Sequence, residues 1–591
     1  MNVSDFILQR LGDWKIDKVF GYPGDGINGL LGAMNRNDSV RFIQTRHEEM
    51  AAFMACGHAK FTGEVGVCMA TSGPGAIHLL NGLYDAKLDH QPVIAIIGQQ
   101  KGTSLGSNYQ QEVDLMSLYK DVASEYVQMI IDPAQARQVI DRAFRIAKAE
   151  RTVTAVIIPN DIQEEKALEQ PPRMHGNVVT GAGHSKNHVI PAQSELAKAA
   201  DVLNSGEKVA ILIGAGAFGA EAEIREVAEL LGAGVAKALL GKAVLPDDLP
   251  YVTGSIGMLG TKASWELMEG CDTLLMIGSS FPYAEYLPEP GKARGVQIDI
   301  DGKMLSIRYP MEVNLLGDSR DTLKALIPLL RHKQDRVWRT KIEQRVDEWW
   351  QTVEDRANLA ADPVNPQLVL QRLSPLLPDN CILTADSGTS AFWYARNIKI
   401  RSGMMASLSG NLATMCPAIP YAIAAKFAYP DRIPVAISGD GAMQMLGMNE
   451  LITIAKYFKE WSTPGLLVIV LNNRDLNMVT WEQRMLAGEP KFEASQDIPD
   501  VNYAAFATLV GLKGIRIDHP DQIDVALNEV LNSDRPAVLD VVCDPNVPII
   551  PPHVDKTMLS KFGRAMIKGD PESSSVIRQV IKQAMQGGSS L

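Results

Sequence analysis

The chain has 591 residues, which predicts about three to four domains at about 100–200 residues per domain. Hydrophobic residues make up 46% and charged residues 21%, as in an ordinary soluble globular protein. The net charge of -12, without a block of like charges, argues against a nucleic-acid-binding protein. Six scattered cysteines without a CxxC pair form neither a disulfide framework nor a zinc motif, and they fit a reducing compartment. No apolar run reaches the roughly 18 residues of a membrane span, and charges interrupt the N-terminal apolar stretch, so we expect neither a span nor a signal peptide.

Short apolar runs alternate with helical patterns along the first part of the chain. The runs end in or near Gly, Pro or Asn, and a helical pattern such as 48–61 lies between them. This alternation is typical of βαβ units in a parallel sheet. We therefore predict a first domain at 1–170, with strands within 18–24, 65–75, 91–99 and 152–161.

The rest of the chain repeats this pattern twice. Residues 166–192 are rich in Pro and Gly and are predicted to be a linker, and "DPVNPQ" at 362–367 marks a second boundary after a charged helical segment at 322–356. The prediction is a fold of three doubly wound parallel-sheet α/β domains with a C-terminal extension. The second domain covers 190–335, with strands within 208–216, 271–280 and 295–301; the third covers 360–545, with strands within 380–388, 433–441, 465–473 and 536–545; the extension covers 546–591.

Polar residues stand where two apolar runs of the third domain end. One run ends in "GDG" with Asp440 at its centre, and the next ends in Asn472 and Asn473. In open parallel sheets, ligands bind at the carboxyl ends of strands. Carboxylate and amide oxygens suit Mg²⁺, and adjacent glycines let backbone N–H groups reach a phosphate. An exposed tight turn is the alternative interpretation of "GDG" alone.

This pair of motifs resembles that of the thiamin diphosphate enzymes, in which GDG is followed by NN. The interval here is several residues longer than usual, because it contains "FKEWSTPG" at 458–465. The resemblance implies that Asp440, the side chain of Asn473 and the carbonyl of Asp475 bind Mg²⁺, which holds the diphosphate. The adjacent residues Gly439, Gly441 and Ala442 are then expected to line the cofactor.

The stretch "TRHEEMAAFMACGHAKFTG" at 45–63 resembles the family's second motif. There the first glutamate of "RHE", here Glu48, bonds the aminopyrimidine ring of the cofactor. The chemistry requires such a group, because the thiazolium carbon acid is too weak to ionise unaided near neutral pH. In the alternative interpretation Glu48 and Glu49 are only a solvated helix start.

Further positions of the cofactor pocket follow from the same resemblance. Met415 in "NLATMCPAIPYAIAAK" takes the place of the bulky residue between the two cofactor rings, although a core methionine is the alternative. The stretch "TADSGTSAFW" at 384–393, with Ser387, resembles the other edge of the pocket. The expected set on the first domain is Gly73, Pro74 and His78, with a purely structural role as the alternative for His78.

Within the superfamily, the chain is most similar to the pyruvate oxidases. The segment 71–99 carries their "HLLNGLYD" motif, which acetohydroxyacid synthases lack. "GAGAFG" at 214–219 matches a dinucleotide fingerprint, but no acid ends a strand about 20 residues later. The resemblance instead implies that this domain binds FAD, and a middle domain without flavin is the alternative. The expected flavin residues are Gly214, Gly216, Gly254, Ser255, Gly278, Phe281, Asp299 and Asp318.

The region after the second asparagine departs from the pyruvate oxidase pattern. Met478 replaces the usual Phe and, with Trp481, is similar to acetohydroxyacid synthases, whereas Glu482 stands where oxidases carry a functional glutamate. Gln110 replaces an aromatic residue, and Gln111 is a candidate substrate-side group. We therefore expect Gln111, Met478 and Glu482 to act beside Glu48 in catalysis.

The tail at 550–583 resembles the end of the quinone-reducing pyruvate oxidases. An apolar helical face is expected there, comprising Val576, Ile577, Val580, Ile581 and Met585, with Arg578, Gln579 and Lys582 facing away. Such a helix can lie on a membrane. Alternatively, it covers its own active site or packs on a neighbouring subunit.

The predicted function is thiamin diphosphate- and FAD-dependent oxidative decarboxylation of pyruvate or a similar 2-oxo acid. Acetate or acetyl phosphate would be the product, with quinone or oxygen as the electron acceptor. The resemblance implies a homodimer or homotetramer, because the cofactor lies between the first and third domains of different subunits. We expect a cytoplasmic protein, at the inner face of the cell membrane if the tail binds lipid.

Two rival functions stay open. A carboligase of the acetohydroxyacid-synthase class would use any flavin only structurally; Met478 and Trp481 favour it, and the "HLLNGLYD" motif and the tail disfavour it. A non-catalytic relative is the second rival, and the intact Glu48, Asp440 and Asn473 argue against it.

Overall fold

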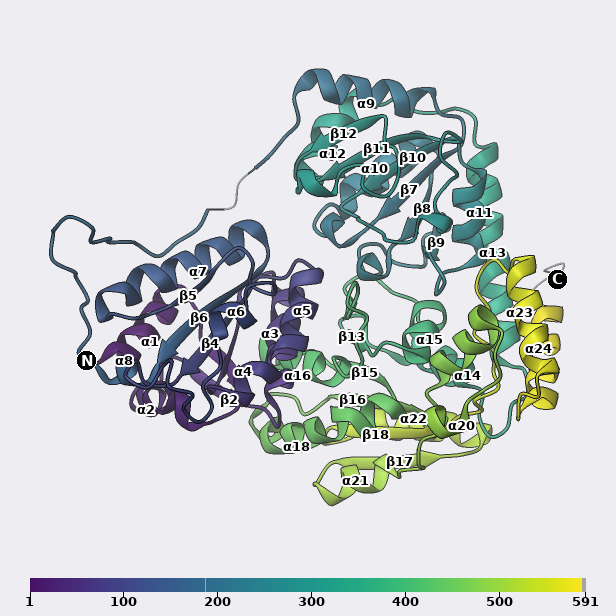
Figure 1. Ribbon diagram of the computed structural model, residues 1–591. Helices are drawn as coiled ribbons and strands as arrows, with labels where there is room; N and C mark the ends of the chain where they lie inside the picture. Colours follow the sequence, from purple (N-terminus) through teal and green to yellow (C-terminus); the bar gives the residue numbers. More distant parts are fainter. Residues whose placement is uncertain (186–187, 587–591) are drawn as a thin grey trace.

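The computed structural model describes residues 1–185 and 188–586. Two residues of the predicted linker and the last five of the predicted extension, 587–591, lie outside the described residues. Figure 1 shows three lobes in chain order, each built on one sheet with helices against it. Each sheet has six strands, and every strand pairs in parallel with its neighbours. The predicted fold class is therefore confirmed.

The first sheet has the strand order β2-β1-β3-β4-β6-β5. Its strands are β1 (Lys18–Gly21), β2 (Arg41–Gln44), β3 (Gly66–Ala70), β4 (Val93–Gln99), β5 (Val127–Met129) and β6 (Val153–Pro159). The helices of this part are α1 (Val3–Asp13), α2 (Asn28–Arg36), α3 (Glu48–Thr62), α4 (Pro74–His78), α5 (Leu80–Leu88), α6 (Leu115–Leu118), α7 (Ala136–Glu150) and α8 (Asn160–Glu164). Apolar strands buried on both faces form the core, as expected for a doubly wound sheet.

The middle sheet has the order β12-β11-β10-β7-β8-β9. Its strands are β7 (Val209–Ile213), β8 (Gly234–Lys237), β9 (Val252–Ser255), β10 (Thr273–Ile277), β11 (Arg294–Asp299) and β12 (Val313–Leu316). The helices are α9 (Gln193–Ser205), α10 (Glu221–Leu231), α11 (Lys262–Gly270), α12 (Ser319–Leu326) and α13 (Val337–Ala357), together with the short 3-10 turn η3 (Ala215–Ala217).

The third sheet has the order β14-β13-β15-β16-β18-β17. Its strands are β13 (Ile382–Ala385), β14 (Met405–Leu408), β15 (Pro434–Gly439), β16 (Leu467–Asn472), β17 (Lys513–Ile517) and β18 (Ala537–Val542). The helices are α14 (Pro366–Leu373), α15 (Thr389–Asn397), α16 (Ala418–Ala428), α17 (Asp440–Ala442), α18 (Met448–Tyr457), α19 (Asn477–Glu482), the π-helix η11 (Gln483–Ala487), α20 (Glu493–Gln496), α21 (Tyr503–Leu509) and α22 (Ile523–Leu531). The extension forms α23 (Lys556–Ile567) and α24 (Ser573–Gln586).

The sequence patterns missed mainly the strands at the sheet edges. The edge strands β2, β5, β9, β12, β14 and β17 were all missed, and so was β8, a short buried strand inside the middle sheet. An edge strand needs fewer apolar residues than a central one, so its apolar run is weaker. The predicted strands, in contrast, lie in the sheet interiors, where both faces are buried.

The charged helical segment predicted at 322–356 consists of parts of two helices with a break between them. α12 ends at Leu326, Pro328 lies in a short turn, and α13 begins only at Val337. Proline lacks the backbone N–H that a helix interior requires, which explains the break.

The helix in the extension packs differently from the expected amphipathic arrangement. Val576 is buried, but so is Gln579, whereas Ile577, Ile581 and Met585 are exposed. The prediction that Gln579 faces away is therefore wrong. Its amide donates to Asp544 Oδ2 at 3.1 Å, and a buried carboxylate requires such a donor. In the part of the chain that the structure describes, no helix has the length and apolar character to cross a membrane.

The first and third domains share one apolar cluster, built largely on α3 and α16. At its margin the Gln44 N–H donates to the Tyr457 hydroxyl at 2.7 Å. Glu450 on α18 is buried nearby and accepts a long 3.4 Å hydrogen bond from the Arg46 N–H. Burial raises the pKa of Glu450 to about 7, so the folded protein favours its protonated form.

Replacing Glu450 by Gln is expected to stabilise the protein at alkaline pH. The pKa of Glu450 is higher in the folded protein than in the unfolded chain, so binding of a proton by Glu450 stabilises the fold. This stabilisation is present at acid pH and is lost as the pH rises through about 7. The gain should be roughly 3 kcal/mol at pH 8 and less than about 1 kcal/mol at pH 5. Thermal unfolding at both pH values measures it. As control, Glu460→Gln removes the exposed partner of Arg41 and should show no such pH dependence; equal gains at both pH values would contradict the prediction.

Candidate functional site

The carboxyl ends of β15 and β16 bring the two predicted metal-binding motifs together. In the parallel register Gly439 lies opposite Leu471, so Asp440 and Asn473 follow at the same edge of the sheet. Asp440 is buried and accepts the N–H of Gly441 at 2.9 Å and the N–H of Arg474. Burial raises the pKa of Asp440 to about 7 despite these bonds. Such a desolvated carboxylate is well suited to a cation.

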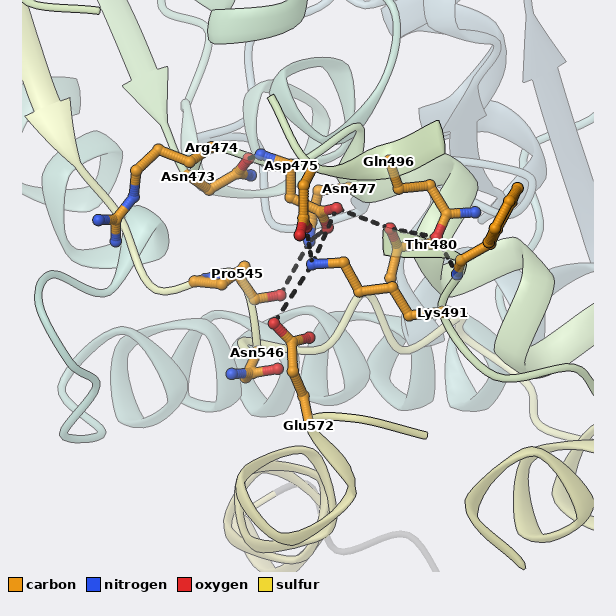
Figure 2. Close-up of polar contacts among 12 residues, drawn as sticks. Asn473, Arg474, Asp475, Asn477, Thr480, Lys491, Gln496, Pro545, Asn546 and Glu572 are labelled. Atoms are coloured by element: carbon orange, nitrogen blue, oxygen red, sulfur yellow. Dashed lines mark hydrogen bonds and ion pairs between the residues drawn. The ribbon is translucent and has the colours of Figure 1, made fainter. Parts of the chain in front are cut away.

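The loop after Asn473 is held by its own side chains, as Figure 2 shows. Asn473 Oδ1 accepts the Asp475 N–H at 3.1 Å. The Asp475 carboxylate accepts from Asn477 Nδ2 at 2.8 Å and from Thr480 Oγ1 at 2.9 Å. Because these bonds occupy the carboxylate, the Asp475 main-chain oxygen is the atom that fits the predicted metal contact. That carbonyl also accepts the Asn477 N–H at 2.7 Å and keeps its second lone pair.

Strained backbone marks the predicted site. Among the described residues, nine other than glycine have positive φ, and four of them, Gln111, Ala413, Cys416 and Arg474, lie at or beside predicted site residues. Ala413 and Cys416 flank Met415, whose Cε would lie 3.1 Å from a Cβ added at Gly441. Strained conformations persist where surrounding structure enforces them, often at ligand sites. Met415 therefore lies beside "GDG", in a stretch of backbone with two positive φ angles.

The first turn of α3 holds the second predicted cluster. Glu48 is buried, and its Oε2 lies 2.9 Å from Nδ1 of His78, whose side chain is 43% exposed. The His47 ring stacks on His78 with 4.5 Å between centroids, and burial first, then the nearby His78, lowers the pKa of His47. These contacts connect a buried carboxyl to a more exposed imidazole, which is an arrangement that can move a proton.

The loop before α4 lies against the same cluster. Gly73 has a φ of 63° and precedes Pro74 at the first helical position. A Cβ at Gly73 would lie 2.9 Å from the Gln111 Cβ, so only glycine fits there. A Cβ at Gly75 would approach Glu48 Oε1 to 3.3 Å. The first-domain residues of the predicted site are thus neighbours.

One amide links the two clusters within the chain. Asn81 Nδ2 donates to Glu49 Oε1 at 2.8 Å and to Thr414 Oγ1 at 3.1 Å, next to Met415. No hydrogen bond or ion pair within residues 1–185 and 188–586 joins Glu48 to Asp440 or Asn473. Within one chain, Glu49 rather than Glu48 is the acid of α3 that is linked to the third domain.

Two of the predicted substrate-side residues, Met478 and Glu482, lie on α19, whereas the third, Gln111, lies beside Gly73 in the first domain. Met478 packs partly buried against the third-domain core, and Trp481 is fully buried, donating from its ring N–H to the Pro545 carbonyl at 3.3 Å. Glu482 is half-buried, and burial raises its pKa. Ser387 follows the buried Asp386, whose pKa burial raises to about 6. Trp481 is therefore a core residue here.

The predicted flavin residues follow the carboxyl ends of strands in the middle sheet. Gly214 follows β7, Gly254 and Ser255 end β9, Gly278 follows β10 and Asp299 ends β11. The Ser255 hydroxyl is buried without a hydrogen-bond partner among the described residues, although other buried polar atoms of the chain share this property. This edge is where a doubly wound sheet binds ligands, so the position and the orphaned hydroxyl fit a bound group.

The remaining flavin candidates have structural roles of their own. A Cβ at Gly216 would lie 2.8 Å from the Gly278 Cα, so these glycines are required for loop packing whether or not flavin binds. Phe281 is buried beside Tyr283, and the Asp318 side chain caps α12 by accepting the N–H of Arg320. β8, the strand after the glycine-rich turn, ends in Lys237 rather than an acid.

Sequence reasoning missed several residues of this region. Lys491 and Arg484 form ion pairs with the acids Asp570 and Glu572 next to the loop that follows Asn473, although the acids are far from both in the sequence. No motif could reveal them, since their proximity depends on the folding back of the extension. His47 was the one detectable residue, because it directly precedes Glu48 in "RHE".

The fold and this edge geometry define a thiamin diphosphate enzyme, and the chain belongs to the thiamine pyrophosphate enzyme family. Residues 1–118 match the N-terminal TPP binding domain of these enzymes, 196–326 their central domain and 386–541 their C-terminal TPP binding domain.

Curated relatives span almost the whole chain. A putative thiamine pyrophosphate-containing protein of Bacillus subtilis is 34% identical and covers 98% of both chains. The large subunit of acetolactate synthase isozyme 2 of Escherichia coli is 32% identical, over 95% of this chain and 100% of its own. Pyruvate oxidase of Lactiplantibacillus plantarum is 27% identical, over 92% of this chain and 89% of its own.

Proposed function

We propose that this enzyme oxidatively decarboxylates pyruvate or a similar small 2-oxo acid. The pairing of Asp440 and Asn473 at one sheet edge carries the proposal, because it supplies hard oxygen ligands beside the glycines that can approach a diphosphate. Bound thiamin diphosphate supplies the electron sink for loss of CO2, which no side chain can provide. The chain's own residues bind it, orient it and move protons.

Each first-domain residue has a stated role in the proposal. Glu48 accepts and returns a proton at the aminopyrimidine, and its hydrogen bond to His78 fixes the carboxylate. Gln111, next to Gly73, donates toward the substrate, and Met415 shapes the cofactor's bend. Met478 and Glu482, one helical turn apart on α19, face the small substrate.

The middle domain would hold FAD as the acceptor of two electrons. With water as co-reactant, pyruvate yields acetate, CO2, two protons and two electrons; with phosphate, acetyl phosphate replaces acetate. The orphaned Ser255 hydroxyl at the sheet edge and the "HLLNGLYD" resemblance support the flavin step. Quinone or oxygen would then reoxidise the flavin.

We further propose a homodimer or homotetramer. Among the described residues, no hydrogen bond or ion pair joins Glu48 itself to Asp440 within one chain; the Asn81 link passes through Glu49 instead. Since both must reach one cofactor, a second copy would supply the missing half of each site.

An anaerobic spectrum tests the proposal. The purified protein is mixed with Mg²⁺, thiamin diphosphate and pyruvate without oxygen, and the visible flavin band is followed; lactate, which lacks the keto group, is the control. A band that bleaches with pyruvate only is the expected result. A band that persists while CO2 is released makes the flavin structural, and a protein without flavin overturns the redox step.

A carboligase is the second candidate, favoured by the 32% identical acetolactate synthase subunit. Met478 and Trp481 agree with that class. It predicts acetolactate from two pyruvate molecules rather than acetate, so analysis of the products in the same reaction separates the two. No decarboxylation and no cofactor binding by calorimetry would leave the non-catalytic alternative.

A further inference from the structure

We propose that Lys491 and the C-terminal segment 570–572 position the metal-binding loop, so that the extension helps to set the affinity for Mg²⁺. The inference rests on the metal ligands proposed above, not on the oxidation step. It assigns to Lys491 and Glu572 a positioning role, since neither is proposed to touch metal, cofactor or substrate.

Lys491 is the central contact. Its side chain is only 5% exposed, and its Nζ lies 3.3 Å from Asp475 Oδ1, 2.7 Å from Asp497 Oδ1 and 3.3 Å from Glu572 Oε1. Figure 2 shows the ammonium group between Asp475 above and Glu572 below. One buried cation therefore connects the metal loop to the extension.

The main chain strengthens the same connection. The N–H of Lys491 donates to Asp570 Oδ2 at 2.9 Å, and the N–H of Glu572 donates to Asp570 Oδ1 at 3.0 Å. Asp475 also forms an isolated antiparallel bridge with Asp497. The loop, the segment around Lys491 and the start of α24 are thus held in one arrangement.

Arg484 ties the predicted substrate-side helix to the same segment. Its fully buried guanidinium binds Asp570 through two bonds, of 2.8 and 2.9 Å, and Glu572 through a third of 2.8 Å. Bidentate Arg–carboxylate pairs fix orientation as well as charge. Because α19 runs directly into η11, segment 570–572 holds the metal loop through Lys491 and the substrate side through Arg484.

The physical consequence concerns the Asp475 carbonyl. A metal ion binds tightly only when each ligand atom lies within a few tenths of an ångström of its ideal position, and contacts behind the ligands hold them there. If Lys491 is lost, Asp475 keeps Asn477 and Thr480 but loses its cation and its link to the extension. The carbonyl is then less well oriented, which weakens metal binding without removing a metal ligand.

Three variants test the inference: Lys491→Met, Glu572→Gln and the double variant. Calorimetry of thiamin diphosphate binding over a series of Mg²⁺ concentrations gives the apparent Mg²⁺ dissociation constant. We expect it to rise about 10- to 100-fold in Lys491→Met, the usual effect of losing a partner behind a metal ligand. Glu572→Gln should shift it in the same direction by less. The double variant should bind Mg²⁺ about as weakly as Lys491→Met, since the Lys491–Glu572 pair is already lost and Arg484 keeps its two bonds to Asp570.

A matched control comes from a second contact of the same extension. Glu489→Gln breaks the exposed ion pair to Lys568, another link between the extension and the segment after η11, and should leave Mg²⁺ binding unchanged. Single variants within about twofold of wild type, or a lower melting temperature with unchanged Mg²⁺ affinity, would show a merely structural role and overturn the inference. If the wild-type protein binds no thiamin diphosphate in the presence of Mg²⁺, both this inference and the proposed metal ligands are overturned. A missing flavin would affect only the oxidation step.

Discussion

Replacing Glu48 by Gln should lower turnover by about 100- to 10,000-fold, the usual contribution of a proton-transferring group. The amide keeps the shape of the side chain but cannot take a proton. Glu48 lies in the first turn of α3, buried and 2.9 Å from His78. Because the proposed metal and diphosphate ligands lie in the third domain instead, the substitution should not disturb binding of the diphosphate. Thiamin diphosphate affinity, measured by calorimetry with Mg²⁺, should therefore change little. The exchange of the cofactor's acidic proton for deuterium should slow in proportion to turnover.

Glu49→Gln is the matched control for this prediction. It removes the neighbouring carboxylate of the same helical turn, one that bonds Asn81 rather than His78. It should retain turnover within about tenfold, because only a hydrogen bond of roughly 1 kcal/mol is altered. If Glu49→Gln were the inactive variant and Glu48→Gln the active one, the assignment of the activating acid would be wrong.

Replacing Asp440 by Asn should weaken Mg²⁺-dependent binding of thiamin diphosphate by about 100-fold or more, beyond the 10- to 100-fold cost of losing a supporting residue. The buried carboxylate is a charged ligand, and an amide offers one neutral oxygen in its place. Burial already raises the pKa of Asp440 to about 7, so the folded protein should tolerate a neutral side chain there. Calorimetry at pH 8 with and without Mg²⁺ measures the effect, and activity should fall in parallel.

The control is Asp500→Asn, which removes a carboxylate near the same sheet edge. Its two bonds of 2.8 Å go to Arg516, it accepts a long 3.4 Å hydrogen bond from Asn472, and it has no proposed metal contact. It should bind cofactor as wild type does. Asp440→Asn with unchanged Mg²⁺ dependence would refute the metal assignment, whatever its activity.

The local motifs could be found from sequence because each is a short stretch with fixed chemistry. "GDG" ends an apolar run, "NN" ends the next, and "RHE" opens a helix, so the residue types themselves indicated where a ligand would bind. Most central strands were predicted correctly because burial on both faces demands continuous apolar runs, and only the short β8 was missed among them. The edge strands β2, β5, β12 and β17 lack that demand and were missed.

Packing partners could not be found in the same way. Gln579 was expected to face outward, yet it is buried because Asp544 lies beneath it and requires a donor. The break between α12 and α13 comes at Pro328, and the charged helical pattern around this proline hid the break in the sequence. The Gln579–Asp544 contact joins residues distant in sequence, whereas the helix break is a local effect of Pro328.

By itself, the sequence determined the fold class, the family and the residues whose chemistry suits a thiamin diphosphate site, because these depend on local pattern and residue type. Only the tertiary structure decided that Glu48 pairs with His78, that Glu49 rather than Glu48 is linked to the third domain, and that Lys491 connects Asp475 to Glu572. The physical reason is that an ion pair or hydrogen bond acts over a few ångströms in space. Which residues come that close is set by how the sheets and helices pack, and no pattern along the chain records it.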